Sequence, residues 1–236
     1  MGHLNGGMGG VVRVGDRVHR ATGYWTPAVH ALLAHLDGRV PHVPRVHGFD
    51  EHGREVLDFL PGTFCEPLTL AQITSLVTWM RELHEAVAGF VHSGPWRHFE
   101  IADPVFIGHN DVAHYNACFD GDRLTGVFDW DMAGPTNPLM ELAFSSWNIV
   151  PLWTDIGAEL AAQRLTHLAE CYGGPGAHEI LHAVPTRIQI MLDGIPRRAA
   201  AGDDGMRNLM TLGEPGRSAA NLADLISRIS SIDRCL

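Results

Sequence analysis

Three polar residues near the middle of the chain have the types and spacing needed to hold a metal ion and to move a proton. Asp111 and Asn116 lie five residues apart, and Asp129 follows thirteen residues later. Between them, two short apolar runs flank Asp120-Gly121, a pair typical of tight hairpin turns. Because a hairpin brings its ends together, we predict that Asn116 and Asp129 lie side by side, with Asp111 one loop away. Two carboxylates and an amide oxygen suit Mg²⁺ carrying phosphates.

The same stretch resembles a known family, the aminoglycoside phosphotransferase and choline-kinase-like branch of the protein-kinase-like fold. The matching elements are His109-Asn110-Asp111, Asn116 and Phe128-Asp129-Trp130. Asn110 stands where the family usually has Gly. The resemblance implies that Asp111 is the catalytic base, that Asn116 and Asp129 hold Mg²⁺, and that ATP or GTP supplies the phosphoryl group.

Four further residues are candidates for supporting the site or contacting the substrate. Glu141 stands where the family commonly has an acidic residue that braces the catalytic loop, and His109 begins the motif. His114, inside the loop, is a candidate either for an acceptor contact or for packing. Asp131 either supports the metal site, directly or by holding a second ion, or is solvated.

The N-terminal region resembles a kinase nucleotide-binding lobe. Its glycine run includes Gly7, Gly9 and Gly10, which either cover nucleotide phosphates through their N–H groups or form a terminus without fixed structure. Arg20 stands where the family has a phosphate-binding Lys. The following helix offers only Val29 and His30 where its Glu partner would be, so we expect Arg20 to bind phosphate without a carboxylate partner.

The order of the predicted elements indicates an α+β fold with a shortened N-terminal β-sheet lobe and a larger, mainly helical C-terminal lobe. We expect a nucleotide lobe over residues 1–60 and a catalytic and substrate lobe over 61–236. Backbone groups of Asp58 to Leu60 would hold the adenine edge at the hinge. The predicted strands cover residues 11–14, 17–20, 54–60, 103–107, 117–119 and 124–128. The predicted helices cover 27–36 (with Thr26 as N-cap), 68–91, 139–150, 155–171, 178–201 (interrupted at its prolines) and 218–229, and 47–53 and 201–216 are expected as a turn and a loop.

Composition narrows the functional classes. The 236 residues carry a formal charge of −10, which argues against a nucleic-acid partner and fits either a cationic substrate or simple solubility. The four cysteines, Cys65, Cys118, Cys171 and Cys235, have no paired spacing and are expected to be free thiols. No segment is long and apolar enough to span a membrane, and no signal peptide is recognised, so we expect a cytoplasmic protein. No sequence pattern indicates the oligomeric state.

These observations predict a phosphotransferase that moves the γ-phosphate of ATP or GTP to a hydroxyl of a small molecule, for example a cationic antibiotic such as an aminoglycoside. Two alternatives stay open. The chain could be a non-catalytic nucleotide-binding, immunity or regulatory module on the kinase fold, since its Lys–Glu pair is missing. His109, Asp111, His114, Asp129 and Asp131 could instead form the centre of a metal-dependent hydrolase.

Overall fold

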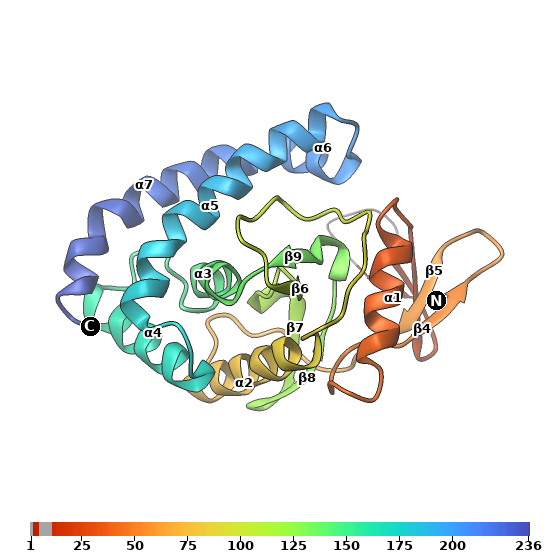
Figure 1. Cartoon of the computed structure of the whole chain (residues 1–236), viewed down its shortest axis with the longest axis horizontal. Helices are drawn as coiled ribbons and strands as arrows, with labels where there is room; N and C mark the ends of the chain where they lie inside the picture. The colour runs from red at the N-terminus through yellow and green to blue at the C-terminus, as the bar shows by residue number, and fades with distance from the viewer. Residues whose placement is uncertain (1, 5–10) are drawn as a thin grey trace.

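The N-terminal part of the chain forms an antiparallel sheet with one helix beside it (Figure 1). The computed structural model describes residues 2–4 and 11–236. The sheet has five strands in the order β1-β2-β3-β5-β4. These strands are β1 (Gly2–Leu4), β2 (Val11–Val14), β3 (Arg17–Arg20), β4 (Val46–Phe49) and β5 (Glu55–Asp58), and the helix is α1 (Thr26–Leu36). Buried Leu32, Leu33 and Leu36 form the inner face of α1.

The remainder is mainly helical, with two small two-stranded sheets at its centre (Figure 1). Its helices are α2 (Leu70–Ala86), α3 (Pro138–Ile149), α4 (Ala158–Tyr172), α5 (Ala177–Ala200), α6 (Asp204–Thr211) and α7 (Glu214–Asp233). Its strands are β6 (Phe106–Gly108), β7 (Ala117–Asp120), β8 (Arg123–Val127) and β9 (Gly134–Thr136), and its 3₁₀ turns are η1 (His114–Asn116) and η2 (Trp130–Met132). β6 pairs with β9 and β7 with β8, both antiparallel.

Helix α2 is central to the packing of this part. Its capping box, in which Thr69 and Gln72 exchange hydrogen bonds, fixes where it begins. Ile73, Leu76 and Leu83 are fully buried along one stripe, as the i, i+3, i+4 spacing predicts. The α+β class is therefore confirmed, while the division into lobes at residues 60 and 61 stays a prediction.

Helix α5 corrects the expectation of a segment interrupted at its prolines. It runs unbroken through Pro185 and Pro196. An interior proline costs about 3 kcal/mol, but α5 packs against other helices and buries many apolar side chains, among them Leu181, Val184 and Ile188. Gly194 does not break the helix either: a Cβ there would lie 2.2 Å from the Phe99 ring, so the glycine permits a close packing contact.

Three local predictions are wrong for reasons of hydrogen bonding. The expected loop 201–216 contains α6, because the Asp203 side chain accepts from the Met206 N–H as an N-cap. The turn expected over 47–53 is shorter, since β4 pairs with β5 as far as Phe49. Thr26 is the first residue of α1 rather than its N-cap, and its Oγ1 accepts from the Gly23 N–H.

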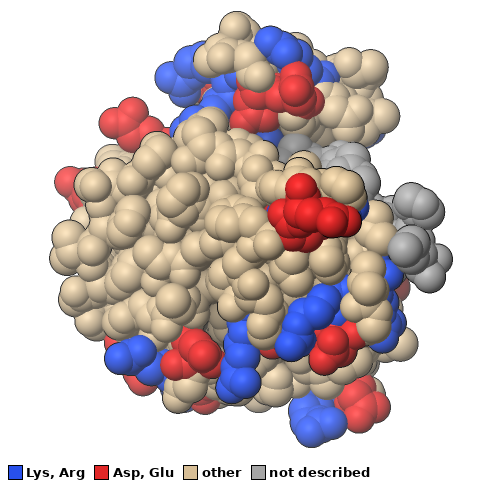
Figure 2. All heavy atoms as spheres, turned by 90° about the vertical axis from the view of Figure 1, so that its right-hand side faces the viewer, with Lys and Arg blue, Asp and Glu red and all other residues tan. Residues whose placement is uncertain are grey.

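Two expectations about the whole chain can be compared with the structure. All four cysteines are free thiols, as predicted. Within the part of the chain that the structure describes, no helix combines the length and the apolar character needed to cross a bilayer. On the face drawn in Figure 2, basic side chains are interspersed with acidic ones rather than gathered into a basic patch.

Candidate active site

The loop that carries Asp111 depends on an unusual backbone conformation at Asn110. Asn110 has φ of +63°, in the left-handed region that Gly adopts freely and that Asn tolerates better than most residues. The replacement of the family's Gly by Asn is therefore conformationally conservative. The Asn110 side chain also donates to the Gly134 carbonyl at 3.0 Å, which ties the loop to β9.

Asp111 lies at the start of this loop with both carboxylate oxygens engaged. Oδ1 accepts from the Tyr115 hydroxyl at 3.0 Å, and Oδ2 accepts from Asn116 Nδ2 at 2.9 Å. Burial, together with the negative charge of Asp129, raises the Asp111 pKa to about 7, although Tyr115, Asn116 and the Arg187 charge act in the opposite direction. Asp111 and Asp129 therefore lie close enough for their charges to interact.

The β7–β8 hairpin places Asn116 beside the residue that precedes Asp129. Ala117 pairs with Val127, and the Phe128 N–H donates to the Asn116 carbonyl at 3.0 Å. Gly121, with φ of +61°, lies in the two-residue turn. Asp129 itself has φ of +59°, a strained conformation for a non-glycine residue, and its side chain is 45% exposed. The hairpin thus presents the Asp129 carboxylate to an open space.

Two buried charged residues hold the backbone of the catalytic loop from below. Glu141, 1% exposed, accepts from the Asn110 N–H and also bonds His84 Nε2. Arg187, on α5 and 2% exposed, donates to the Asn110 carbonyl at 3.0 Å. Sequence reasoning missed Arg187, because nothing in its local pattern distinguishes it from other arginines of an amphipathic helix.

The two motif histidines have their ring nitrogens engaged within the protein. His109 is fully buried; its Nδ1 accepts from the Asp111 N–H at 3.2 Å, so Nε2 is the nitrogen that donates to the Phe128 carbonyl at 3.1 Å. Burial lowers its pKa, so the ring stays neutral. His114 lies 3.2 Å from the Asn148 carbonyl through Nδ1 and 3.5 Å from Glu66 through Nε2. Both ring nitrogens of His114 thus have partners within the protein, and its role in an acceptor contact stays a prediction.

The five residues proposed for a hydrolase centre do not converge. Over residues 2–4 and 11–236, no cluster of three or more His, Cys, Asp or Glu ligand atoms includes His109, Asp111, His114, Asp129 or Asp131. Because both His109 nitrogens are committed to backbone partners, the ring offers no lone pair to a metal ion. The structure gives the hydrolase alternative no metal centre.

Arg20 has carboxylate partners, which corrects the expectation that it has none. Its Nε lies 2.7 Å from Glu55 Oε1, and the other Glu55 oxygen is 2.7 Å from His30 Nε2. Glu55 is 3% exposed and lies on β5, the strand paired with β3. The carboxylate thus comes from the neighbouring strand instead of the helix, and His30 on α1 bonds it from the other side. The chain contains no lysine at all, since all 17 of its basic residues are Arg.

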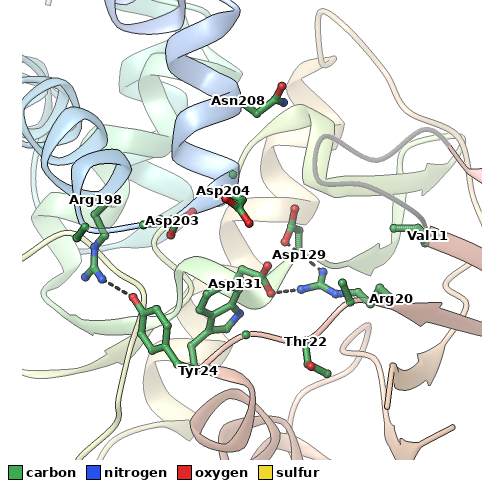
Figure 3. Close-up of a pocket in the computed structure, with 16 residues that line it drawn as sticks. Val11, Arg20, Thr22, Tyr24, Asp129, Asp131, Arg198, Asp203, Asp204 and Asn208 are labelled. Atoms are coloured by element: carbon green, nitrogen blue, oxygen red, sulfur yellow. Dashed lines mark hydrogen bonds and ion pairs between the residues drawn. The ribbon is translucent and has the colours of Figure 1, made fainter. Parts of the chain in front are cut away.

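The far end of the Arg20 guanidinium reaches the carboxylates of Asp129 and Asp131 (Figure 3). Its Nη1 donates to Asp129 Oδ1 at 3.2 Å, and its Nη2 is hydrogen bonded to Asp131. Asp131 is 6% exposed and also lies 3.7 Å from the Arg97 guanidinium. It is therefore not solvated, which removes one of the two options for this residue.

A cavity of about 660 Å³ opens beside these residues, between the N-terminal sheet and the end of α5 (Figure 3). Arg198 on α5 hydrogen bonds the Tyr24 hydroxyl across its mouth. Arg97 forms a bidentate ion pair with Asp203, the N-cap of α6. Its Nε donates to Oδ2 and its Nη2 to Oδ1, each at 2.7 Å. The sequence analysis did not predict that Tyr24, Arg198 and Asp203 lie at this cavity. Its lining residues are Val11, Arg20, Ala21, Thr22, Gly23, Tyr24, Trp25, Asp129, Asp131, Arg198, Ala201, Gly202, Asp203, Asp204, Gly205 and Asn208.

The proposed nucleotide contacts are described only in part. Gly7, Gly9 and Gly10 lie outside the described residues. At the hinge, the Asp58 N–H donates to the Arg45 carbonyl and the Phe59 N–H to the Asp16 carbonyl. The Asp58 side chain bonds Arg17 and His47. Adenine recognition there would therefore depend on carbonyl groups and on Leu60, and it stays a prediction.

Comparison with known proteins agrees with this geometry. Residues 95–179 match the model of the phosphotransferase enzyme family. This stretch contains the loop of Asp111, the β7–β8 hairpin and Glu141. Over these residues the chain is similar to members of that family. The predicted family resemblance is thereby confirmed.

One curated relative and several solved structures resemble the chain. The trifolitoxin immunity protein of Rhizobium leguminosarum bv. trifolii is 33% identical over 165 residues, which is 65% of this chain and 63% of that protein. The match thus spans less than two thirds of that relative. An amicoumacin kinase in complex with AMP-PNP, Ca²⁺ and amicoumacin has a TM-score of 0.58 at 13% identity, covering 91% of this chain and 81% of that one. A choline/ethanolamine kinase family protein from Mesorhizobium loti has a TM-score of 0.58 at 16% identity, covering 98% and 91%. At these identities the structures show a shared fold, and the predicted kinase-like architecture is confirmed.

The side-chain oxygens of Asn116 and Asp129 have the chemistry needed to bind a divalent cation. Asn116 uses its Nδ2 to bind Asp111, which turns that group away and leaves its Oδ1 as an oxygen donor. The half-exposed Asp129 carboxylate supplies charged oxygens. Amide and carboxylate oxygens are the ligands of hard cations such as Mg²⁺.

Proposed function

We propose that the chain is a phosphotransferase that moves the γ-phosphate of ATP or GTP to a hydroxyl of a small molecule. The observation that carries this proposal is the convergence of Asp111, Asn116 and Asp129 on one loop and hairpin, with Arg20 reaching Asp129 from the opposite sheet. A base, a cation site and a phosphate-binding guanidinium are the parts that phosphoryl transfer needs.

In this proposal Asp111 orients the acceptor hydroxyl and takes its proton as the new P–O bond forms. Tyr115, whose hydroxyl bonds Asp111 Oδ1 and which is 45% exposed, lies where the acceptor would approach and must yield that oxygen to the incoming hydroxyl. Asn116 and Asp129 would hold Mg²⁺, which when bound neutralises charge on the phosphate oxygens. Glu141 and Arg187 keep the loop backbone in place during the reaction.

The nucleotide would lie between a lobe of residues 1–60 and a lobe of residues 61–236. Arg20 would exchange its contacts with Asp129 and Asp131 for phosphate oxygens, while Glu55 continues to hold its Nε. Gly7, Gly9 and Gly10 would cover the phosphates, and backbone groups of Asp58 to Leu60 would contact the base.

The acceptor that we favour is a cationic antibiotic or toxin. The cavity beside Asp129 is lined by four carboxylates, those of Asp129, Asp131, Asp203 and Asp204, against the two guanidinium groups of Arg20 and Arg198. A lining with this excess of negative charge favours a positively charged ligand. The name of the 33% identical relative, an immunity protein against trifolitoxin, supports a role in protection against a toxic compound. Phosphorylation of such a compound would protect the cell that carries the protein.

A second candidate is a non-catalytic immunity module that binds nucleotide without turnover. It is favoured by the contacts of Arg20 with Asp129 and Asp131, which occupy both the phosphate-binding group and a metal ligand. In this case ATP would raise the melting temperature, yet no acceptor would be phosphorylated.

One experiment tests the proposal and separates the two candidates. The full chain is incubated with ATP or GTP and Mg²⁺ against a panel of hydroxyl-bearing antibiotics, peptide toxins, amino alcohols and sugars, with phosphorylated products detected by mass spectrometry and ³¹P NMR. We expect a product 80 Da heavier than one acceptor, its formation abolished by EDTA and restored by Mg²⁺. Nucleotide-dependent stabilisation without any product across the panel would favour the binding module.

Glu55→Gln is expected to weaken nucleotide binding about 10-fold or more. The substitution removes the charge that anchors Arg20 Nε at 2.7 Å, and a hydrogen bond to a charged group contributes about 1.5–3 kcal/mol. Without this anchor, the guanidinium is fixed only by its contacts with Asp129 and Asp131, which a bound nucleotide has to displace. The measurement is calorimetric titration with AMP-PNP and Mg²⁺. Asp37→Asn, which loosens an exposed pair with Arg45 in the same lobe, serves as the control and should leave binding unchanged; equal affinities for Glu55→Gln and wild type would contradict the anchoring role.

A further inference from the structure

Two histidines at the start of α5 and a carboxylate at the end of α7 converge on one point. His178 and His182 are one helical turn apart, so their rings lie on the same face and stack with centroids 4.4 Å apart. Asp233 is the last residue of α7. The three candidate ligand atoms all lie within 4.8 Å of one another, and within residues 2–4 and 11–236 they form the single such cluster of His, Cys, Asp or Glu.

The cluster is separate from the site described above. It lies near the C-terminus of the chain (Figure 1), whereas Arg198 at the other end of α5 lines the active-site cavity. Along the helix, the sixteen residues from His182 to Arg198 correspond to about 24 Å. The phosphotransfer proposal uses none of the three residues.

The interatomic distances come close to those around a tetrahedral metal ion. Ligand atoms bound at about 2.0–2.2 Å to one tetrahedral ion lie roughly 3.3 Å apart. His182 Nε2 lies 2.7 Å from Asp233 Oδ2, and His178 Nε2 lies 3.6 Å from Asp233 Oδ1. The observed values fall on either side of the required one. The His178 and His182 side chains are 71% and 46% exposed, so small rotations can close the difference.

Asp233 also carries an unsatisfied atom that a metal ion would satisfy. Its Oδ1 is buried and has no hydrogen-bond partner, although the side chain as a whole is 25% exposed. A buried carboxylate oxygen without a partner is costly, since it has lost its hydration without replacement. Because Oδ1 lies on the side of His178, a cation between the two would compensate it.

The donor set selects the kind of ion. Two imidazole nitrogens and one carboxylate oxygen suit Zn²⁺ and its neighbours among the late divalent transition metals, whereas Mg²⁺ prefers oxygen ligands alone. Three protein ligands leave a fourth position for water. We propose that His178, His182 and Asp233 bind one Zn²⁺ ion or a related transition-metal ion, which joins the start of α5 to the end of α7.

The test uses the untagged, metal-stripped full chain, because a histidine tag would itself bind Zn²⁺. Zn²⁺ is titrated against a competing chromophoric chelator, and thermal unfolding is followed with Zn²⁺ or Mg²⁺ added. We expect one Zn²⁺ per chain, bound at least 10-fold more weakly by Asp233→Asn and by the double variant His178→Asn/His182→Asn. Zn²⁺ should raise the melting temperature of the wild type and not that of the double variant.

His52→Asn is the matched control, since His52 is 67% exposed on the β4–β5 turn beside Glu51 and belongs to no such cluster. It should retain the wild-type Zn²⁺ affinity. Circular dichroism of the metal-free variants shows whether they are folded, and the exposure of both histidines predicts that they are. Equal Zn²⁺ binding by the double variant and the wild type, or no binding by the wild type, would overturn the proposal, and neither readout depends on phosphotransfer activity.

Discussion

Asp111→Asn is expected to lower the rate of phosphotransfer by a factor of about 10²–10⁴, the usual contribution of a general base, while nucleotide binding is preserved. The two side chains have the same shape. An Asn at this position can still bond Tyr115 or Asn116, which hold the carboxylate at 3.0 and 2.9 Å. It cannot accept the proton of an acceptor hydroxyl. The loop should therefore keep its geometry and lose its base.

The measurement has two parts: kcat with an acceptor found in the screen, and the AMP-PNP affinity by calorimetry. Asp120→Asn is the control, because Asp120 lies on the same hairpin, is exposed and pairs only across the turn with Arg123 at 3.2 Å. It should behave like the wild type in both measurements. A transfer rate for Asp111→Asn equal to that of the wild type would refute Asp111 as the base.

The parts of the site that are encoded locally were predictable from the sequence. The hairpin turn, the two short strands and the separation of Asn116 from Asp129 depend on residues within about twenty positions of one another. Turn chemistry and alternation suffice to predict such an arrangement. The αL conformation at Asn110 could also have been predicted, since a position that takes Gly in relatives and Asn here favours positive φ.

The partner of Arg20 was not predictable in the same way. Sequence reasoning looked for a carboxylate on the helix after β3 and found Val29 and His30, but the pairing of β3 with β5 sets Arg20 directly opposite Glu55. This register depends on a residue 35 positions away in the sequence, on another strand. The sequence shows His30 at the expected position of the helix, but not that it bonds Glu55. An ion pair can keep its chemistry while one member moves to another element.

The buried arginines illustrate a second limit. Arg97, Arg164 and Arg187 are all more than nine-tenths buried, and each bonds a backbone or carboxylate group far away in sequence. From the sequence alone an Arg is predicted to lie on the surface, because Arg is almost never buried without a partner. Only the fold reveals that partner. For Arg187 it is the backbone of the catalytic loop itself, which makes α5 part of the active-site support.

Glu141→Gln is expected to destabilise the protein by about 3–5 kcal/mol, the usual cost of breaking a buried ion pair by removing one partner. Glu141 is 1% exposed, and its two oxygens bond the Asn110 N–H and His84. A Cβ at Gly108 would lie 2.5 Å from its Oε2, so the surrounding backbone leaves no room for rearrangement. At roughly 2–4 °C per kcal/mol for a chain of this size, the melting temperature should fall by about 6–20 °C.

The difference in the free energy of unfolding between wild type and Glu141→Gln should shrink as the pH falls. Burial acts to raise the pKa of Glu141, but the charge and hydrogen bond of His84 and the Asn110 N–H outweigh it and lower the pKa from its ordinary value of 4.5. A carboxyl whose pKa is lowered by folding stabilises the native state above its unfolded pKa, and this contribution is lost as the pH falls toward the folded pKa. Urea unfolding of both proteins at pH 7 and at about pH 4 measures this difference at each pH. Glu170→Gln, at an exposed position of α4, should change stability by less than about 0.5 kcal/mol at either pH. A difference for Glu141→Gln that stays constant or grows in acid would mean that the Glu141 charge does not support the catalytic loop, leaving only the shape of the side chain to do so.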